Sequence, residues 1–217
     1  MNTKLITLTF LLFINLAFSQ NKRFNYGLNI LPNYSFVTAI NQGELNSEFV
    51  NAIMKNEKNK FAFSCNAFLK YNFNDKLSLI SGLGFQNNGE QSGKYKVYRI
   101  VYNRNNFELM INVKYHFTKR WFGVIGVSEF YNLSNKTKSI LYPNNQRKVN
   151  SNVEDKLTDF NAFNTGINIG FGYNVIHKEN YRIFLQPNFQ YGLFGVAKNV
   201  NLNRRFVLLG LNLGVEF

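Results

Sequence analysis

Cysteine, histidine and proline are scarce in this chain of 217 residues, which has one cysteine and three prolines. The lone cysteine, Cys65, excludes a disulfide within the chain. Cys65 and the two histidines, His116 and His177, lack the spacing of metal ligands, so we expect no metal and no cofactor. Neither histidine has a serine or aspartate arranged as a catalytic partner. We therefore expect no catalytic site and no enzyme.

Acidic residues are also few, with 12 Asp and Glu against 25 Lys and Arg and a formal net charge of +13. Such an excess of positive charge suits anionic lipid, an acidic partner or nucleic acid. Which of these applies depends on where the chain is located.

Long apolar runs are absent apart from one near the start, which extends from Leu5 to Phe18 after Lys4. This run is too short for a membrane-spanning helix, and small residues follow it. It predicts a signal peptide over 1–19, although a buried first strand is the alternative. The remaining residues, 20–217, fit one domain. Export excludes nucleic acid as a partner.

Strict alternation is the strongest pattern present, and it is clearest over Arg204–Phe217. Every second residue there is apolar, and the residues between are mostly small or polar. The apolar positions are Val207, Leu209, Leu211, Leu213, Val215 and Phe217. A period of two predicts a strand with two different faces, as in a transmembrane β-barrel. A Lys or Arg facing mid-bilayer costs roughly 2–4 kcal/mol, and the apolar faces of the clearest strands carry no charge.

Eight segments of this kind predict an all-β, eight-stranded antiparallel up-and-down barrel. We place the strands at 24–36, 60–73, 77–90, 105–117, 121–131, 160–174, 181–194 and 204–217. Short connections alternate with long ones, which is typical of short periplasmic turns and longer outer loops. Aromatic residues cluster near both ends of the strands and predict two girdles at the membrane interfaces. The third outer loop, 132–159, shows no strand periodicity.

Three positions fit this pattern poorly. Glu129 falls among apolar residues, so we expect it to point inward or to lie near the rim. Pro32 and Pro187 fall within strands, where each removes a ladder hydrogen bond, so we expect bulges there.

Several phrases resemble the PorT-like family of small outer-membrane β-barrels. They are Tyr71–Phe85, Phe107–Phe117, Gly166–Tyr173 and Leu209–Phe217. The resemblance implies location in the outer membrane of a Gram-negative bacterium. It also implies insertion by the barrel assembly machinery, with Phe217 in the assembly signal. The family is named after a factor linked to protein secretion, but no residue here carries that role over.

Inward positions of the predicted strands hold five charged residues, namely Lys70, Glu108, Lys114, Arg182 and Glu216. Eight strands enclose little free space, so we expect a plug of paired side chains rather than a pore lining. If Phe194 faces Arg204 in the last two strands, then Arg182 faces Glu216.

A second group of charges flanks the second outer loop, namely Lys94, Lys96, Arg99 and Arg104. No acid lies among them in the sequence, so we expect either a rim that binds lipopolysaccharide phosphates or a solvated rim.

These patterns favour a membrane barrel with a filled lumen that acts through its outer loops. That action would be binding, envelope integrity or assistance to secretion, with envelope or secretion-system proteins as partners. A narrow passive channel is one alternative. A secreted, soluble lipocalin-like barrel with the apolar face inside is another, but its outer surface would carry more charge than this polar face does.

Overall fold

The computed structural model describes residues 23–41, 55, 57–92, 98–141, 148–154, 160–178, 180–196 and 202–217. The predicted signal peptide over 1–19 lies outside these residues, as do Lys94 and Lys96. Among the described residues, no helix has the length and apolar character needed to cross a membrane.

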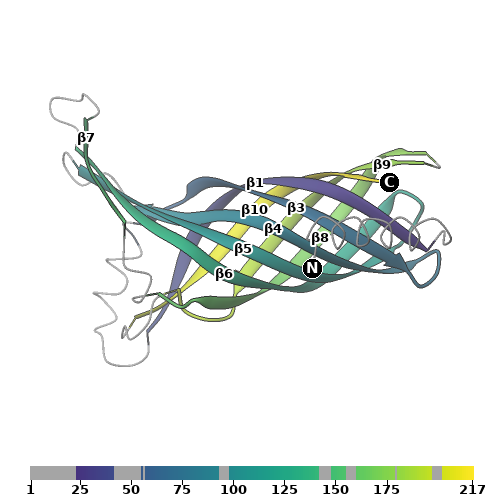
Figure 1. The fold of residues 1–217 in the computed structure, drawn as a ribbon, viewed down its shortest axis with the longest axis horizontal. Coiled ribbons are helices and arrows are strands. Elements are labelled where there is room, and N and C mark those ends of the chain that lie inside the picture. Colours follow the sequence, from purple (N-terminus) through teal and green to yellow (C-terminus); the bar gives the residue numbers. More distant parts are fainter. Residues whose placement is uncertain are drawn as a thin grey trace, which may run out of the picture.

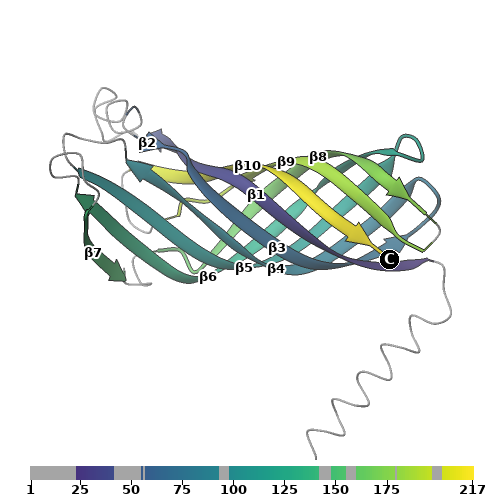
Figure 2. The same cartoon turned by 90° about the horizontal axis from the view of Figure 1, so that it is seen from above.

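Eight antiparallel strands close into a ring (Figures 1 and 2). They are β1 (Phe24–Asn41), β3 (Lys60–Asn72), β4 (Leu77–Ser92), β5 (Tyr98–His116), β6 (Trp121–Leu141), β8 (Phe163–His177), β9 (Arg182–Gly192) and β10 (Leu202–Glu216). Each strand pairs with its neighbour in the chain, and β4 pairs with β5. Two short strands, β2 (Glu57–Lys58) and β7 (Lys148–Glu154), pair with β4 and β6 outside the ring. The predicted fold class is confirmed.

The first and last strands close the ring in a continuous register, with Leu28 opposite Val215 and Val37 opposite Phe206. At the end of the ladder, Tyr26 and Phe217 exchange backbone hydrogen bonds of 3.2 and 2.8 Å. The edges of β1 and β10 pair along this seam except at Leu31 and Pro32, and a barrel in lipid requires such closure.

The two faces of the sheet have opposite chemistry. Large apolar side chains from all eight strands are exposed on the outside, including Ile30, Phe61, Leu83, Ile111, Ile125, Phe171, Leu185 and Leu209. Buried polar side chains fill the inside, including Asn33, Ser64, Lys70, Gln86, Glu108, Asn112, Ser128, Asn168, Gln190 and Glu216. The lipocalin-like alternative requires the reverse arrangement and is therefore wrong.

The short turns lie at the end of the barrel where β1 begins and β10 ends. We call this the turn end. In the turn between β3 and β4, Asn74 Oδ1 accepts hydrogen bonds from the amides of Lys76 and Leu77 at 2.9 and 2.8 Å. In the turn between β5 and β6, Thr118 Oγ1 accepts from the amides of Arg120 and Trp121 at 3.2 and 3.0 Å. These side chains substitute for backbone acceptors and fix the turns.

Aromatic rings gather at both levels where girdles were predicted. At the turn end, the ring centroids of Trp121 and Tyr173 are 4.7 Å apart. At the opposite end, which we call the loop end, the rings of Tyr131 and Phe163 are 5.2 Å apart.

The third outer loop differs from the sequence prediction. β6 continues to Leu141, β5 begins at Tyr98, and β7 pairs with the end of β6. We call this extension, formed by 98–105, 132–141 and 148–154, the ribbon (Figure 1). The prediction failed because the ribbon rises past the loop-end aromatic rings, where neither face needs to be apolar and no alternation marks the strands.

The two prolines do not form bulges, contrary to expectation. The register is unchanged on either side of Pro32 and Pro187. Each proline leaves a gap in the pairing with only one neighbouring strand. Because proline lacks the backbone N–H, it loses a hydrogen bond to only one of its two neighbouring strands. The hydrogen bonds to the other neighbouring strand keep the proline's strand in register.

Glu129 lies on the outer face near the loop-end rim, beside the aromatic pair of Tyr131 and Phe163. Its carboxylate accepts a 2.6 Å hydrogen bond from Thr165 Oγ1.

Candidate functional site

The candidate site is the lumen, which side chains fill in three layers between the turn end and the loop end. In the layer nearest the turn end, Glu216 is surrounded by three cations. Its Oε1 contacts Lys70 Nζ and lies 3.2 Å from Arg182 Nη1, and its Oε2 lies 3.4 Å from Lys114 Nζ. Lys70, Lys114 and Glu216 are almost fully buried, whereas the Arg182 side chain is 31% exposed. We call these four residues the Glu216 cluster.

The register of the last two strands is the predicted one, with Arg182 opposite Glu216. The sequence paired Glu216 with Arg182 alone. The structure adds Lys70 from β3 and Lys114 from β5, because Glu216 points across the lumen.

An aromatic plug lies beside this cluster. Lys114 Nζ is 4.0 Å from the ring centroid of Phe122 and 5.2 Å from that of Phe184. Such cation–π contacts stabilise a buried ammonium group. The two rings belong to a buried apolar group with Phe68, Ile80, Met110 and Val124.

Inward glycines make room for these two rings. A Cβ at Gly172 would lie 2.2 Å from the Phe122 ring, and one at Gly214 would lie 2.2 Å from the Phe184 ring. Each glycine faces its phenylalanine on the neighbouring strand, since Phe122 pairs with Gly172 and Phe184 with Gly214, so the Gly-rich inner face accommodates these large rings.

The middle layer is a network of amides around Glu108. Its Oε1 accepts hydrogen bonds from Ser128 Oγ at 2.7 Å and from Gln190 Nε2 at 3.1 Å. Asn168 donates to Ser128 at 2.7 Å and accepts from Gln190 at 2.7 Å. No ion pair joins Glu108 to a cation within the described residues, so neutral donors alone solvate this carboxylate.

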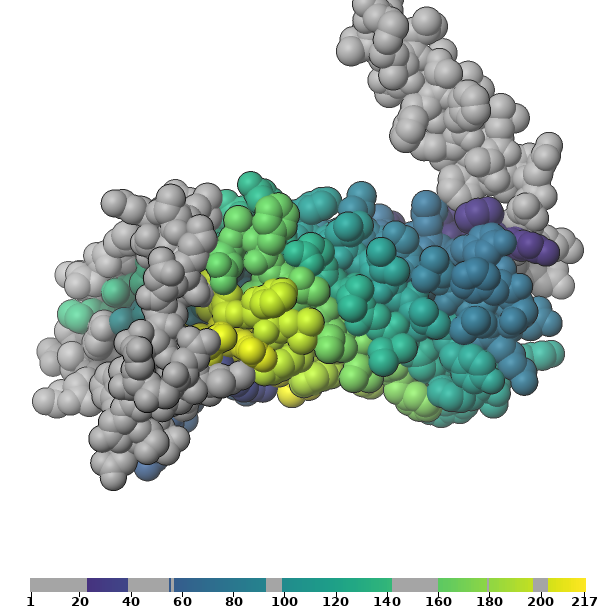
Figure 3. Space-filling model, turned by 90° about the horizontal axis from the view of Figure 1, so that it is seen from below, coloured from purple at the N-terminus to yellow at the C-terminus, as the bar shows by residue number. Residues whose placement is uncertain are grey.

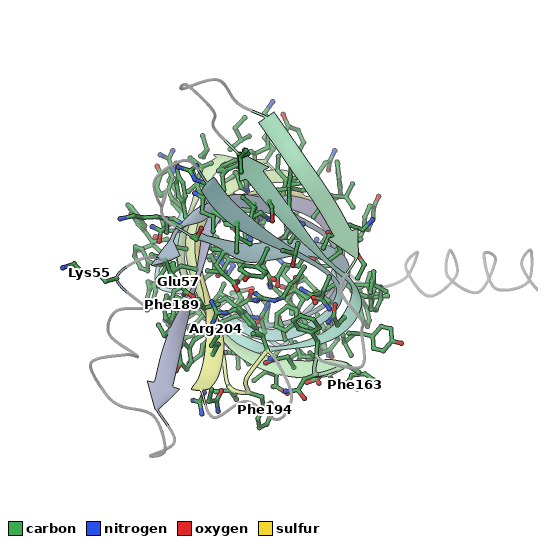
Figure 4. All side chains as sticks on the ribbon, turned by 90° about the vertical axis from the view of Figure 1, so that its left-hand side faces the viewer. Lys55, Glu57, Phe163, Phe189, Phe194 and Arg204 are labelled. Carbon is green, nitrogen blue, oxygen red and sulfur yellow. The ribbon has the colours of Figure 1, made fainter. Side chains whose placement is uncertain are left out.

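The layer nearest the loop end is a chain of ion pairs. Arg104 Nη2 lies 2.7 Å from Glu90 Oε1, and Arg204 Nη2 lies 3.3 Å from the same atom. Arg204 also contacts Glu57 of β2, and Figure 4 shows these two residues side by side at the mouth of the barrel. We call these four residues the mouth cluster.

The mouth cluster corrects one sequence prediction. Arg104 was expected on an outer rim with no acid nearby, but it is buried and paired with Glu90. Arg104 is an even-numbered residue of β5, so it shares the inward face with Glu108. Arg99 lies farther out on the ribbon.

Sequence reasoning missed Glu57, Glu90 and Arg204. Alternation within the predicted strand 77–90 already places Glu90 on the same face as Gln86, which was a usable signal. Glu57 lies in β2, before the predicted strand 60–73, so periodicity gave no indication of it.

The lumen beside Arg104 narrows to a cavity of about 20 Å³, lined in part by Asn88, Asn106, Asn132 and Asn164. A space of that size holds about one water molecule.

Glu57 provides a pH-dependent contact at the mouth, beyond the loop-end ring pair of Tyr34 and Phe61. Its pKa is raised to about 7, chiefly by burial and also by Glu90, although Arg204 and Arg104 lower it. Because the folded pKa lies above the ordinary value, the stability linked to this group is greatest below about pH 4.5. It is lost as the pH rises through 7.

We expect a carboxyl ¹³C NMR titration of Glu57 in detergent micelles to show a midpoint near pH 7. In an Arg204→Gln variant the midpoint should move upward, because a nearby positive charge favours the ionised form. A midpoint near the ordinary value of 4.5, or no change in the variant, would contradict this account.

No three His, Cys, Asp or Glu side chains come together as a metal site in the described parts of the chain. His116 is buried 5.6 Å from the Phe122 ring, and His177 lies at the exposed end of β8.

The ring of strands, the apolar outer face and the polar filled lumen define a small membrane β-barrel. The chain belongs to the family described as outer membrane protein beta-barrel domain, whose profile matches residues 18–198.

Among solved structures, Neisserial surface protein A is 12% identical, with a TM-score of 0.43. The alignment covers 90% of this chain and 96% of that one. Ail, the attachment invasion locus protein of Yersinia pestis, is 13% identical with a TM-score of 0.44, and coverage is 89% and 98%. OprG from Pseudomonas aeruginosa is 11% identical with a TM-score of 0.38, and coverage is 89% and 94%. None of the curated proteins matches the chain in sequence.

Proposed function

We propose that this protein is a non-conducting, non-enzymatic barrel in the outer membrane of a Gram-negative bacterium, exported by a signal peptide over 1–19. It acts through the ribbon and the other outer loops, by binding a component of the envelope. The packed lumen carries this proposal, because a barrel closed by paired charges, amides and aromatic rings leaves binding at its surface as the available activity.

The orientation follows the barrel habit of short periplasmic turns and long outer loops. In this orientation the turn end faces the periplasm and the ribbon faces outward. Outward exposure of the ribbon supports lipopolysaccharide or an envelope or secretion-system protein as the partner. The PorT-like resemblance supports assistance to secretion as the form that this binding takes.

A narrow passive channel remains the second candidate because the lumen is polar. Any path through it must pass Phe122 and Phe184, which pack beside Lys114, and then the network around Glu108. These side chains are held by contacts on several strands, so opening the path requires rearranging all of them.

Reconstitution into planar lipid bilayers tests this proposal. The wild-type barrel should give no single-channel steps above the protein-free membrane, because its lumen is packed. A variant with Phe122, Phe184, Glu108 and Gln190 all changed to alanine removes the two plug rings and the centre of the amide network. It should conduct if it assembles, and it serves as the positive control. Reproducible steps from the wild type would replace the binding proposal with the channel.

A further inference from the structure

An apolar groove of about 660 Å³ crosses the outer wall of the barrel, and it comes closest to the turn end at β5 and β6, where Tyr115, Phe117 and Gly123 line it. Its lining includes Gly123, Ile125, Ile169, Pro187, Phe189 and Leu209. Four of these residues form one row across β6, β8, β9 and β10, since Ile125 pairs with Ile169, Ile169 with Phe189, and Phe189 with Leu209. The groove therefore runs from strand to strand around the wall. The strands themselves appear in Figure 3 as diagonal bands of colour.

Two residues with little outward bulk make this hollow. Gly123 lies between Tyr115 and Phe171 in the sheet and has no side chain. A Cβ there would lie 3.2 Å from the Phe117 ring, so the ring leans over the glycine. Pro187 provides the second low point, beside Phe189.

A cation lies at the turn-end border of the groove, on the lipid side of the wall. Arg120 Nη1 donates a 2.7 Å hydrogen bond to the hydroxyl of Tyr173, which points outward from β8. The guanidinium group lies 5.9 Å from the Tyr173 ring. Tyrosine thus holds the arginine at the level of the aromatic girdle rather than in the lumen. Its exposed donors remain available to an anion.

Aromatic rings connect Arg120 to the groove without a break. The Trp121 ring lies 4.7 Å from Tyr173 and 5.2 Å from Phe171, and Phe171 lines the groove. Lys119 and Arg120 occupy one turn that contains no acid. A positively charged rim therefore adjoins the apolar groove. This arrangement matches a lipid in which an anionic headgroup is joined to an acyl chain.

We propose that this groove binds one glycerophospholipid of the inner leaflet, with its phosphate at Arg120 and Lys119 and an acyl chain along the groove. The volume lies within the range of ligand pockets. The proposal rests on the membrane location and orientation proposed above. It is separate from the activity of the ribbon.

Native mass spectrometry of the full barrel in detergent, titrated with dioleoyl phosphatidylglycerol, tests the site. Arg120→Gln should weaken binding of one lipid about tenfold, since a charge-assisted hydrogen bond is lost. Gly123→Leu should weaken it by a similar factor by filling the groove. Dioleoylglycerol, which lacks the phosphate, should bind the wild type about tenfold more weakly than the phospholipid.

Matched controls separate the site from general effects. Arg23 also contacts a tyrosine hydroxyl, that of Tyr71 at 3.5 Å, but not beside the groove. Arg23→Gln and Ser81→Leu, an outward change on β4, should leave binding unchanged. Heat-modifiable gel mobility verifies that each variant is folded.

An equal loss of phospholipid binding in the test and control variants would overturn the lipid site in the groove. Equal binding of dioleoylglycerol and the phospholipid would do the same. Neither result would affect the proposed function. Failure of the proposed function would appear instead as channel steps in the planar bilayer.

Discussion

Replacing Glu216 with glutamine should destabilise the barrel by about 3–5 kcal/mol, the cost of leaving buried charges without their partner. The change removes one negative charge and leaves Lys70, Lys114 and Arg182 together in the lumen. Urea unfolding of the protein in liposomes measures the loss. Glu129→Gln is the matched control. It should cost less than about 1 kcal/mol, because Glu129 lies at the rim and is partly exposed.

The Glu216 cluster also predicts unequal coupling between its members. A double-mutant cycle of Glu216→Gln with Lys70→Met should give a larger coupling energy than one with Arg182→Met. Lys70 is fully buried, whereas the Arg182 side chain is 31% exposed and is solvated in part by water. Equal stability of wild type and Glu216→Gln would show that the cluster does not hold the barrel together.

Deleting Phe217 should reduce assembled barrel in the membrane at least several-fold. Phe217 N donates to Tyr26 O at 2.8 Å and Tyr26 N donates to Phe217 O at 3.2 Å, so the deletion opens the seam between β1 and β10. Unsatisfied backbone groups in lipid cost several kcal/mol each. The deletion also removes the ring stacked on Tyr26, with centroids 5.5 Å apart. The heat-modifiable fraction in isolated membranes measures assembly.

Two comparisons sharpen this result. Phe217→Ala keeps the backbone hydrogen bonds to Tyr26 and removes the aromatic ring. It therefore separates two effects of the deletion, namely loss of seam closure and loss of the terminal aromatic residue that the assembly machinery recognises. Replacing 137–152 with a short Gly/Ser turn removes the tip of the ribbon and should leave assembly intact, since β6 pairs with β8 only over Trp121–Tyr131 and that part is kept. If the ribbon replacement blocked assembly and the Phe217 deletion did not, two assignments would be wrong. These are the placing of the ribbon tip outside the barrel scaffold and the role of Phe217 in closing the seam.

The sequence predicted the ring of strands because lipid requires apolar side chains on the outer face of each strand. Where a strand crosses the bilayer, as in Phe107–Phe117, every second residue is apolar and the strand is visible. Above the bilayer the rule no longer applies. The ribbon, with residues such as Asn135 and Lys136, therefore has strands that periodicity does not reveal.

The lumen was predictable in part for a related reason. Alternation identifies which side chains point inward, and this placed Lys70, Glu108 and Lys114 inside the barrel. It does not state how far a side chain reaches across the lumen. Lys70 and Lys114 meet Glu216 from other strands, and those contacts depend on the diameter and tilt of the closed ring.

The ribbon also has a mechanical consequence. At about 3.3 Å per residue, the stretch 132–141 spans roughly 30 Å of strand beyond the ring. The register shift beside Asn105 and Asn106 lies at its base, where a bulge bends the paired strands. The base of the ribbon is nevertheless anchored to the ring, because β4 pairs with β5 as far as Gln91 and Val101, and Arg104 of β5 is buried against Glu90. A force on the tip, for example from a bound partner, would therefore reach the mouth cluster through Arg104.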